Sequence, residues 1–541
     1  MPTEQKVKRT FEYGPAALRP VEILEGRDYY STDAIPGHTL DTDNQRLNLA
    51  PQLDWNETNP DKPSFVKNKP DIDSILHEID SIRRLQNDTH IYGVVWDKTS
   101  SAMERLYDAA DITTDTTNFV YSGSVNANYD NPFDDIYPWS ECKQCNVDLT
   151  LYRAQTAGDD IRDAVVAWCG DPDFKTDGSN GFVGRYTPEF WYNGYEKDGK
   201  KYIFVADKEV FGFYHHKASI RGHGFCVDDG NNGVTCDDGQ PLAGSDISIA
   251  NVHTKAKNSG FTLMNIYERD AEVALYCVEF ADYNAQDNLG NGCSNLYSTP
   301  NFKCTQAATG ATSVLAPKTV QANCIPGAAL WLSSTNGSGA AGDVRTITSV
   351  EDYDSTYCKI NFTPAKDLTT STYVSVMGKN NADSIGNKSG YVGINGKNNS
   401  WYRGAIMYGN RWQYTLACYR QTGTNHLWLC PESECDNYDM IDTANHIDTG
   451  ITIYTPSSGS WQDVGDITIP HGLSSFGPMT KAASITGDQQ YCAATTNLNA
   501  VALLGGIAYF GAICGVLCAG WNFGAGNSRW DFSSIPLLKS K

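Results

Sequence analysis

The sequence has few basic residues for its length, and this shortage excludes one class of partner. Its 541 residues contain 42 Lys and Arg against 64 Asp and Glu, which gives a formal net charge of −22 at pH 7. Binding to the phosphates of nucleic acid needs clustered cations, so this balance argues against a nucleic-acid partner. An acidic chain is compatible with either a protein or a carbohydrate ligand.

The sequence also lacks the short motifs of several enzyme classes. It contains no Gly-x-Ser-x-Gly elbow and no His-Glu-x-x-His motif, and Gly396-Lys397 lacks the Ser or Thr of a phosphate loop. We therefore expect a protein that is not an enzyme and needs no cofactor. Three histidines lie close together, His215, His216 and His223, but satisfied loop or core histidines are commoner than metal ligands. The sequence leaves metal binding open.

No apolar run opens the chain, because the N-terminus MPTEQKVKRTFEYGP is polar, and we expect no secretory signal. Near the other end, residues 500–521 form 22 residues without a charge, a length that would span a bilayer as a helix. Five glycines fall in this stretch and no basic cluster flanks it. We therefore expect no membrane insertion, and a membrane-anchored surface protein with a span at 500–521 is kept as an alternative.

From residue 91 onward, short aromatic-rich segments alternate with turns that contain Gly, Asn and Asp. Clear examples are IYGVVW at 91–96, KYIFVA at 201–206 and VFGFYHH at 210–216, each with the composition of a strand. One segment, 268–284, instead places apolar residues along one broad side of a helix. A single convincing helix among so many strands predicts an α+β fold in which strands dominate.

The first 70 residues differ from the rest, and we expect them to form an irregular arm. Repeated prolines within 54–70 exclude a long helix or a central strand there. Four isoleucines then occupy the a and d positions of about two heptads, a pattern that favours three or more strands in a coiled coil. They are Ile72, Ile75, Ile79 and Ile82. Because two heptads alone are marginal, one amphipathic helix packed on its own domain is the alternative.

A Gly-, Ser- and Thr-rich stretch at 305–400 interrupts the aromatic pattern. Its segments TYCKINFT and TYVSVMG have the composition of strands, so we expect an inserted small β module. The composition shifts divide the chain into five expected parts. These are an attachment arm at 1–70, a short coiled coil at 71–90, a main domain in two parts at 91–304 and 401–541, and the inserted module at 305–400.

Several short motifs along the main domain occur in a familiar order. They are Tyr92-Gly-Val-Val-Trp96, Phe133-Asp-Asp-Ile-Tyr-Pro-Trp139, Pro188-Glu-Phe-Trp-Tyr192, the helix followed by DNLGNGC, Tyr402-Arg-Gly and Tyr408-Gly-Asn-Arg-Trp412. The series resembles gut-bacteriophage tail proteins that have the C-type-lectin-like fold of the formylglycine-generating-enzyme superfamily. This resemblance implies a C-type-lectin-like domain that carries the inserted β module and follows the extended arm and coiled coil.

The C-terminal segment resembles the variable region of proteins diversified by retroelements. The matching frame consists of Gly505, Gly506, Gly511, Gly515, Asn522 and Trp530, which the resemblance implies to be scaffold. It implies that the intervening residues face a ligand, namely Tyr509, Phe510, Ile513, Leu517, Trp521, Phe523, Asn527 and Arg529. One departure is Ile535, where the family usually has Arg. Glycines let a rigid backbone project such side chains, and large aromatics dominate binding hot spots, although core packing is as common for any one position.

The resemblance implies a phage tail-fibre or tail-tip protein, made in the host cytoplasm and located in the tail of the virion. It would bind a host bacterial surface receptor, either protein or glycan, contact other phage tail proteins through the 1–70 arm, and form a homotrimer. The alternative suggested by the same superfamily is a formylglycine-generating-type enzyme with a reactive cysteine at Cys514 or Cys518.

Overall fold

The structure is a computed structural model of residues 1–541, of which it describes four short segments before residue 89 and most of the chain after it. The early segments are 10–14, 27–31, 38–40 and 46–48. After residue 89 the description omits 115–130, 230, 237–247, 290–301, 325, 327–328, 335–343, 377–392, 395–396, 399–400, 410, 436–443, 457–459, 493–498, 508–512 and 530–531. The four isoleucines of the expected coiled coil, Ile72, Ile75, Ile79 and Ile82, lie outside the described residues.

The chain divides into two compact units, 1–88 and 89–541. The described part of the first unit is a four-stranded sheet in the order β1-β2-β3-β4. Its strands are β1 (Thr10–Gly14), β2 (Arg27–Ser31), β3 (His38–Leu40) and β4 (Arg46–Asn48). β1 and β2 run parallel, whereas the other two pairs are antiparallel. Four short strands therefore precede the proline-rich segment 54–70, within the part of the chain that we expected to be an irregular arm.

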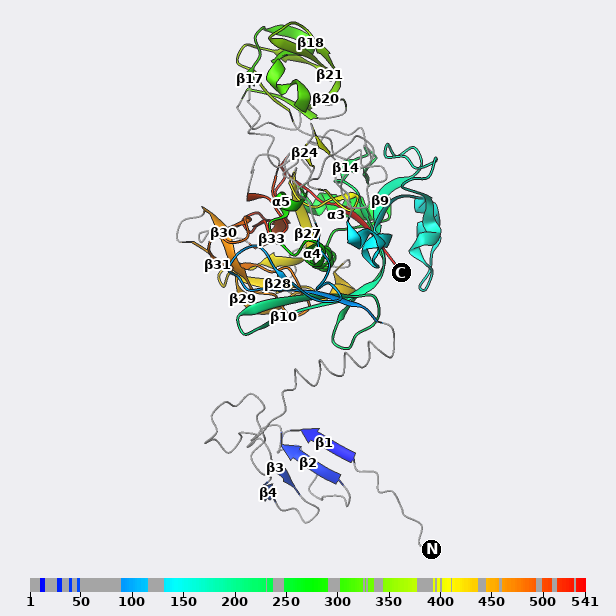
Figure 1. Cartoon of the computed structure of the whole chain (residues 1–541), viewed down its shortest axis with the longest axis vertical. Helices are drawn as coiled ribbons and strands as arrows, with labels where there is room; N and C mark the ends of the chain where they lie inside the picture. The colour runs from blue at the N-terminus through cyan, green and yellow to red at the C-terminus, as the bar shows by residue number, and fades with distance from the viewer. Residues whose placement is uncertain are drawn as a thin grey trace. The chain divides into compact units, whose positions relative to one another are not determined.

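The second unit is a strand-dominated α+β structure, as the sequence predicts. One of its sheets has five antiparallel strands in the order β12-β10-β11-β5-β6 (Figure 1). The strands are β5 (Ile91–Trp96), β6 (Glu104–Tyr107), β10 (Phe190–Lys197), β11 (Lys200–Ala206) and β12 (Tyr214–His216). The expected strand at 210–216 is therefore shorter than predicted, because 210–213 forms the turn that leads into β12.

A second sheet of the unit incorporates the last strand of the chain. It has the order β16-β36-β13-β9-β7-β8, so β36 lies between two strands that come from far earlier in the sequence. The strands are β7 (Lys143–Val147), β8 (Val165–Trp168), β9 (Phe182–Thr187), β13 (Ser219–Gly222), β16 (Thr262–Leu263) and β36 (Pro536–Lys539). The C-terminus is therefore a central part of this sheet.

The nine-stranded sheet contains the stretch that we considered as a membrane span. Its order is β29-β28-β27-β33-β34-β32-β30-β31, and β35 pairs with β27. The strands are β27 (Trp412–Arg420), β28 (His426–Leu429), β29 (Ile447–Thr452), β30 (Ser460–Ile467), β31 (Met479–Ala482), β32 (Gln489–Cys492), β33 (Ala500–Leu504), β34 (Ala519–Gly520) and β35 (Phe532–Ser533). Residues 500–521 thus begin and end as strands. In the part of the chain that the structure describes, no helix is long and apolar enough to cross a membrane.

The described strands at 302–303 and within 308–376 form one sheet with its own apolar core. Figure 1 draws this sheet in green. Its order is β17-β22-β19-β20-β21-β18. The strands are β17 (Phe302–Lys303), β18 (Ala308–Pro317), β19 (Ala329–Ser333), β20 (Val344–Asp352), β21 (Tyr357–Leu368) and β22 (Tyr373–Val376). Leu330, Ile360 and Val374 are fully buried in this core. Among the residues that the structure describes, three further strand pairs lie outside these sheets. They are β14 (Val227–Asp228) with β15 (Val234–Thr235), β23 (Gly393–Ile394) with β24 (Lys397–Asn398), and β25 (Trp401–Tyr402) with β26 (Ala405–Ile406).

The described helices are more numerous than the single one that the sequence indicates. The α-helices are α2 (Leu149–Ala154), α3 (Ile249–Ser259), α4 (Ile266–Phe280) and α5 (Ala285–Leu289). Short 3-10 helices are η2 (Pro132–Asp135), η3 (Trp139–Glu141), η4 (Ile161–Ala164), η6 (Lys318–Asn323) and η8 (Glu432–Glu434). The predicted helix at 268–284 corresponds to α4, whose N-terminus is capped by the Asn265 side chain accepting from the backbone N–H of Glu268.

α4 is buried on every side, not on one broad side as expected. Its charged residues remain inside because each finds a partner. Arg403 donates through Nε and Nη2 to the two carboxylate oxygens of Glu279, at 2.8 and 2.7 Å. Arg221 donates to both oxygens of Glu272 at 2.7 Å, and Arg185 also donates to Glu272. These ion pairs connect α4 to three other parts of the unit, so the helix organises the core around it.

Candidate ligand-binding surface

The C-terminal segment begins with a sharp turn whose backbone conformation favours glycine. β33 ends at Leu504, and Gly505 and Gly506 follow with φ angles of 83° and 80°, in the left-handed region. A Cβ atom on Gly506 would lie 2.4 Å from Sγ of Cys514. A Cβ atom on Gly515 would lie 1.9 Å from Oδ1 of Asp488. These three glycines of the predicted frame therefore have the close backbone packing that a scaffold requires.

Hydrogen bonds from buried side chains hold the backbone that follows this turn. The side-chain carboxyl group of Asp488 accepts from the backbone N–H of Leu517 at 2.7 Å, and Gln490 donates to the carbonyl of Leu517 at 3.0 Å. Arg269 of α4 donates to the carbonyl of Val516 at 3.1 Å. Burial raises the pKa of Asp488 to about 8. The segment is therefore fixed to the core through its backbone.

Two residues that we expected to face a ligand point into the core instead. Leu517 and Trp521 have no exposed side-chain surface. The indole N–H of Trp521 donates to the side-chain oxygen of Gln490 at 3.1 Å, and Leu517 packs in the main apolar core. The backbone bonds described above turn these side chains inward, so the expected ligand-facing role is wrong for both. Ile513 is partly exposed, whereas Tyr509 and Phe510 lie outside the described residues.

The last three expected positions, Phe523, Asn527 and Arg529, are partly exposed and lie together. The ring of Phe523 packs edge-to-face on Phe532 with centroids 4.9 Å apart. The guanidinium of Arg529 lies 5.4 Å from the Phe523 centroid and 5.2 Å from the Phe532 centroid. The Tyr414 hydroxyl donates to the carbonyl of Asn527 at 3.1 Å. The structure thus holds these residues on a fixed base.

Further aromatic residues, which the sequence did not indicate, extend this group across the nine-stranded sheet. Trp461 of β30 and Tyr491 of β32 lie directly opposite each other, with centroids 5.4 Å apart, and both are partly exposed. Trp461 also stacks on Trp412 at 5.8 Å with an interplanar angle of 6°. Trp412, on which Trp461 stacks, lies opposite Phe532 in the β27–β35 register, and Phe523 packs on Phe532.

Polar groups share the face of the sheet that carries these rings. Asp463 and Gln489 are the next residues along β30 and β32 to point to the same side as Trp461 and Tyr491, because side chains alternate along a strand. The amide of Gln489 donates to the carboxylate of Asp463 at 2.5 Å. We define the aromatic surface as Trp461, Tyr491, Phe523 and Arg529, supported by the buried rings of Trp412 and Phe532.

The two cysteines of the enzyme alternative are fully buried, and the pKa of Cys518 lies well above its ordinary value because burial disfavours the thiolate. A nucleophilic or metal-binding cysteine needs a thiolate that is accessible. The side chain of Cys514 packs against the Gly505-Gly506 turn, within the polypeptide's own core. The environment of Cys518 is therefore that of an inert core thiol.

The three histidines considered as metal ligands do not converge. His215 and His216 are neighbours on β12, so their side chains point to opposite faces of the sheet. His216 is buried and pairs with Glu268 at 3.1 Å, whereas His215 pairs with Glu189 at 3.2 Å. Burial lowers the pKa of His223 to about 3. Across the residues that the structure describes, no group of three or more His, Cys, Asp or Glu is arranged to hold a metal ion.

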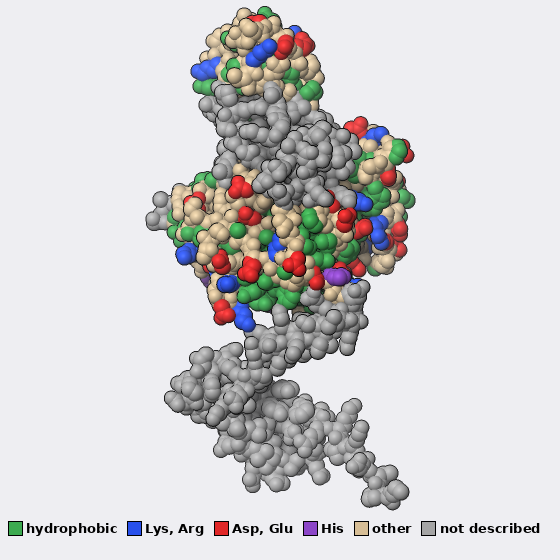
Figure 2. All heavy atoms as spheres, viewed as in Figure 1, with side chains coloured by type: hydrophobic (Ala, Val, Ile, Leu, Met, Phe, Trp, Pro, Cys, Tyr) green, Lys and Arg blue, Asp and Glu red, His purple; other side chains and the backbone are tan. Residues whose placement is uncertain are grey.

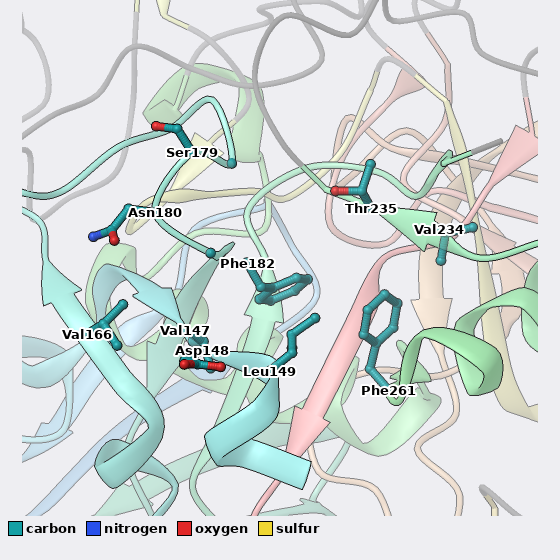
Figure 3. Close-up of a pocket in the computed structure, with 12 residues that line it drawn as sticks. Val147, Asp148, Leu149, Val166, Ser179, Asn180, Phe182, Val234, Thr235 and Phe261 are labelled. Carbon is teal, nitrogen blue, oxygen red and sulfur yellow. The ribbon is translucent and has the colours of Figure 1, made fainter. Parts of the chain in front are cut away.

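A separate cavity of about 460 Å³ lies between α2, β9 and the start of β16 (Figure 3). In the close-up, the rings of Phe182 and Phe261 and the side chain of Leu149 form its apolar wall, and Ser179, Asn180 and Thr235 lie around its rim. Asp148, the only titratable group among the lining residues, caps α2 by accepting from the backbone N–H of Thr150 at 2.7 Å. Among the residues that line it, the cavity is therefore a small recess with both polar and apolar walls and no pair of catalytic side chains.

The arrangement with most potential for recognition is therefore the aromatic surface. It combines partly exposed rings, one guanidinium and one amide–carboxylate pair on a backbone fixed from below. No protein-family model and no curated protein matches this chain. The structure defines a strand-dominated α+β protein, and the aromatic surface is the feature of its described residues that best fits a binding role.

Proposed function

We propose that the chain is a receptor-binding protein of a bacteriophage tail fibre or tail tip, which recognises a host bacterial surface ligand through its C-terminal region. The observation that carries the proposal is the aromatic surface, where Trp461, Tyr491 and Phe523 are partly exposed on a fixed backbone. Rigid aromatic side chains contribute large contact area at a low cost in conformational entropy, as in antibody loops.

The finer description of the fold belongs to the same proposal. The order of motifs from Tyr92 to Trp412 resembles phage proteins with the C-type-lectin-like fold, in which the last segment carries the ligand-binding face. Residues 505–535 would be the diversified segment, with Gly505, Gly506 and Gly515 as its frame. The left-handed turn and the steric environment of these glycines support this assignment. Phe523, Asn527 and Arg529 would contact the ligand.

The rest of the chain would serve attachment and assembly. Residues 1–70 would bind other phage tail proteins in the virion, and residues 71–90 would form a trimeric coiled coil. Three copies of a weak binding surface would add avidity on a bacterial cell. The receptor is either a protein or a glycan, and the amide–carboxylate pair beside the rings is compatible with both.

Binding to intact gut-bacterial cells tests the proposal. The fluorescently labelled full chain is compared with a triple variant, Trp461→Ala, Tyr491→Ala and Phe523→Ala, after circular dichroism has shown that both fold. A matched control is Tyr353→Ala, because Tyr353 is 60% exposed but belongs to the inserted β module. We expect the parent and the control to label a subset of strains, and the triple variant to lose at least about tenfold in apparent affinity.

Two results would contradict the proposal. Equal labelling of all strains by the folded triple variant and by the parent would show that the aromatic surface does not contact the receptor. Labelling lost equally in the Tyr353→Ala control would place recognition in the inserted module instead. Pretreating the cells with protease or with periodate then distinguishes a protein receptor from a glycan.

A further inference from the structure

A polar cleft in the 89–541 unit shares no lining residue with the aromatic surface. It lies between the segment 158–162, the turn 188–189 that joins β9 to β10, the turn 217–218 that joins β12 to β13, and residues 540–541 after β36. Its volume of about 500 Å³ falls within the range of about 300–1,000 Å³ that is typical of small-molecule sites. Two phenol side chains line it, so we call it the tyrosine cleft.

One of these phenols, Tyr186, reaches the cleft from a central strand of a sheet. It belongs to β9, where it lies opposite Lys143 of β7 on one side and Ile220 of β13 on the other. Its ring packs edge-to-face on Trp168 with centroids 5.6 Å apart, and the residue is only 4% exposed. The ring is therefore part of the core, and it holds the hydroxyl in a fixed position at the wall of the cleft.

The Tyr186 hydroxyl forms no hydrogen bond with any residue that the structure describes. Burial raises its pKa well above the ordinary value, while Arg162 lowers the pKa and the carboxylates of Asp160 and Glu141 raise it. All three of these charged residues line the cleft, so the hydroxyl faces it. It keeps its proton at neutral pH and is able both to donate and to accept. Because a largely buried polar group without a partner is costly, this hydroxyl indicates a place where a ligand with its own hydrogen-bonding groups would bind.

The second phenol, Tyr137, is held by neighbours that also line the cleft. Its hydroxyl donates to the backbone carbonyl of Glu189. The carboxylate of Glu189 pairs with Nε2 of His215 at 3.2 Å, and the His215 ring stacks on Trp191 at 4.7 Å with an interplanar angle of 8°. These contacts fix the Tyr137 and His215 rings, so a ligand meets ring surfaces that need no further ordering.

The charges of the cleft nearly balance. The lining carboxylates are Glu141, Asp159, Asp160 and Glu189, and the lining cations are Arg162, Lys217 and Lys541. Most of them are already engaged within the protein, as when Arg162 donates to Asp160 at 2.8 and 2.6 Å. Glu141 and Lys217, by contrast, form no hydrogen bond through their side chains to any described residue. On the face that Figure 2 shows, acidic and basic side chains are likewise interspersed over the described residues.

This balance and the groups left without a partner indicate the chemistry of the ligand. A phosphate or another anion needs a cluster of cations, and an organic cation needs an excess of carboxylates, so a mixed cleft favours an uncharged ligand. Glu141 accepts, Lys217 donates and Tyr186 does both, so a matching ligand carries several groups that donate and accept. The hydroxyl groups of a sugar have this property, and the C–H face of a sugar ring packs on aromatic side chains.

We propose that the tyrosine cleft binds a small neutral saccharide, whose hydroxyl groups form hydrogen bonds with Tyr186, Glu141 and Lys217. The inference goes beyond the proposed function, because the cleft and the aromatic surface have no residue in common. The saccharide is a ligand in addition to the receptor.

Saturation-transfer difference NMR on the full chain tests the tyrosine cleft. The probes are glucose, galactose, mannose, N-acetylglucosamine and N-acetylgalactosamine, each added alone, and we expect saturation transfer to at least one of them. Tyr186→Phe removes only the hydroxyl and keeps the ring that packs on Trp168. It is expected to raise the Kd of the bound sugar by about fivefold or more, and Glu141→Ala acts in the same direction. The matched control is Tyr353→Phe, which removes a phenol hydroxyl from the exposed Tyr353 and leaves the Kd unchanged.

Four results would overturn the inference. A folded parent that transfers saturation to none of the probes would show that the cleft is not a sugar site. An unchanged Kd in both Tyr186→Phe and Glu141→Ala would place the sugar elsewhere on the protein. Loss of sugar binding in the triple variant of the aromatic surface, with an unchanged Kd in Tyr186→Phe, would assign the sugar to that surface. Displacement of the sugar by glycine would assign the cleft to a zwitterionic ligand. Labelling of bacterial cells tests the proposed function separately and does not depend on these results.

Discussion

At the scale of single residues, glycines determine how closely the C-terminal segment packs on the core. Gly515 is the sharpest case, since its added Cβ would lie 1.9 Å from Oδ1 of Asp488, whose other oxygen, Oδ2, accepts from the backbone N–H of Leu517. We expect Gly515→Ala to lower the free energy of unfolding by about 1–3 kcal/mol through overpacking. Gly526→Ala is the control, because no atom lies within 4 Å of its added Cβ. Urea denaturation of both variants checks the difference, and equal stabilities would contradict it.

A buried ion pair that connects α4 to the rest of the unit gives a second prediction for single residues. Arg403 and Glu279 form a two-bond ion pair in which neither side chain is exposed. Replacing one partner leaves the other charge buried alone, so we expect Arg403→Met to lower the free energy of unfolding by about 3–5 kcal/mol. The double variant with Glu279→Gln is expected to recover part of this loss, which a double-mutant cycle measures.

The surface pair Arg162–Asp160 supplies the control for the buried pair. Its side chains are 53% and 39% exposed, and solvent screens their interaction. We therefore expect Arg162→Met to change the free energy of unfolding by less than about 1 kcal/mol. A loss for Arg162→Met as large as that for Arg403→Met would show that burial does not decide the strength of these pairs.

At the scale of elements, the carboxyl group that anchors the segment between β33 and β34 gives the chain a pH dependence. Burial raises the pKa of Asp488 to about 8, above the value of about 4 expected in the unfolded chain. The native state therefore retains a proton that the unfolded state releases. The contribution of this proton to the free energy of unfolding is fully present below about pH 4 and is lost as the pH rises through about 8.

Asp488→Asn is expected to flatten this decline, because the amide keeps an oxygen that accepts from the backbone N–H of Leu517 and cannot ionise. The measurement is the melting temperature of parent and variant across about pH 5 to 8. The pKa of His216 is also raised, so its contribution to the free energy of unfolding also falls as the pH rises. This fall is the same in the parent and in the variant. Glu268, with its pKa lowered to about 2, titrates below the range. Parallel curves for parent and variant would contradict the assignment to Asp488.

The same elements show what the sequence could predict. Strands with alternating or continuous aromatic and β-branched residues were placed well, as at 91–96 and 201–206, because the local pattern determines the burial. The sequence also predicts α4, but its charged residues suggest that one side of the helix faces solvent. In the structure these residues are buried, because they pair with residues from other parts of the unit. The sequence does not indicate α3, because residues 249–259 are mostly polar and only a few apolar side chains mark the side of the helix that is buried. The aromatic surface was found only in part, since Trp461 and Tyr491 join Phe523 through sheet pairing that no local pattern encodes.

At the scale of the whole molecule, the second unit depends on strands that come from its two ends. The last 42 residues, 500–541, supply β33, β34, β35 and β36 to two sheets. β33 pairs with β27 and β34, and β36 lies between β13 and β16. The described strands within 302–376, by contrast, form one sheet with a separate apolar core. The two regions are therefore expected to respond differently to removal.

Truncation after Asn499 is expected to abolish cooperative unfolding, because both sheets lose central strands and their apolar faces become exposed. Replacing 302–376 with a flexible linker is the control, which should leave the near-UV circular dichroism and the cooperative melt of the remainder in place. Both variants are compared with the parent at equal concentration. A truncated chain that stays soluble and melts cooperatively would contradict this dependence. It would instead favour the alternative in which 500–521 is dispensable to the fold and serves as an anchor.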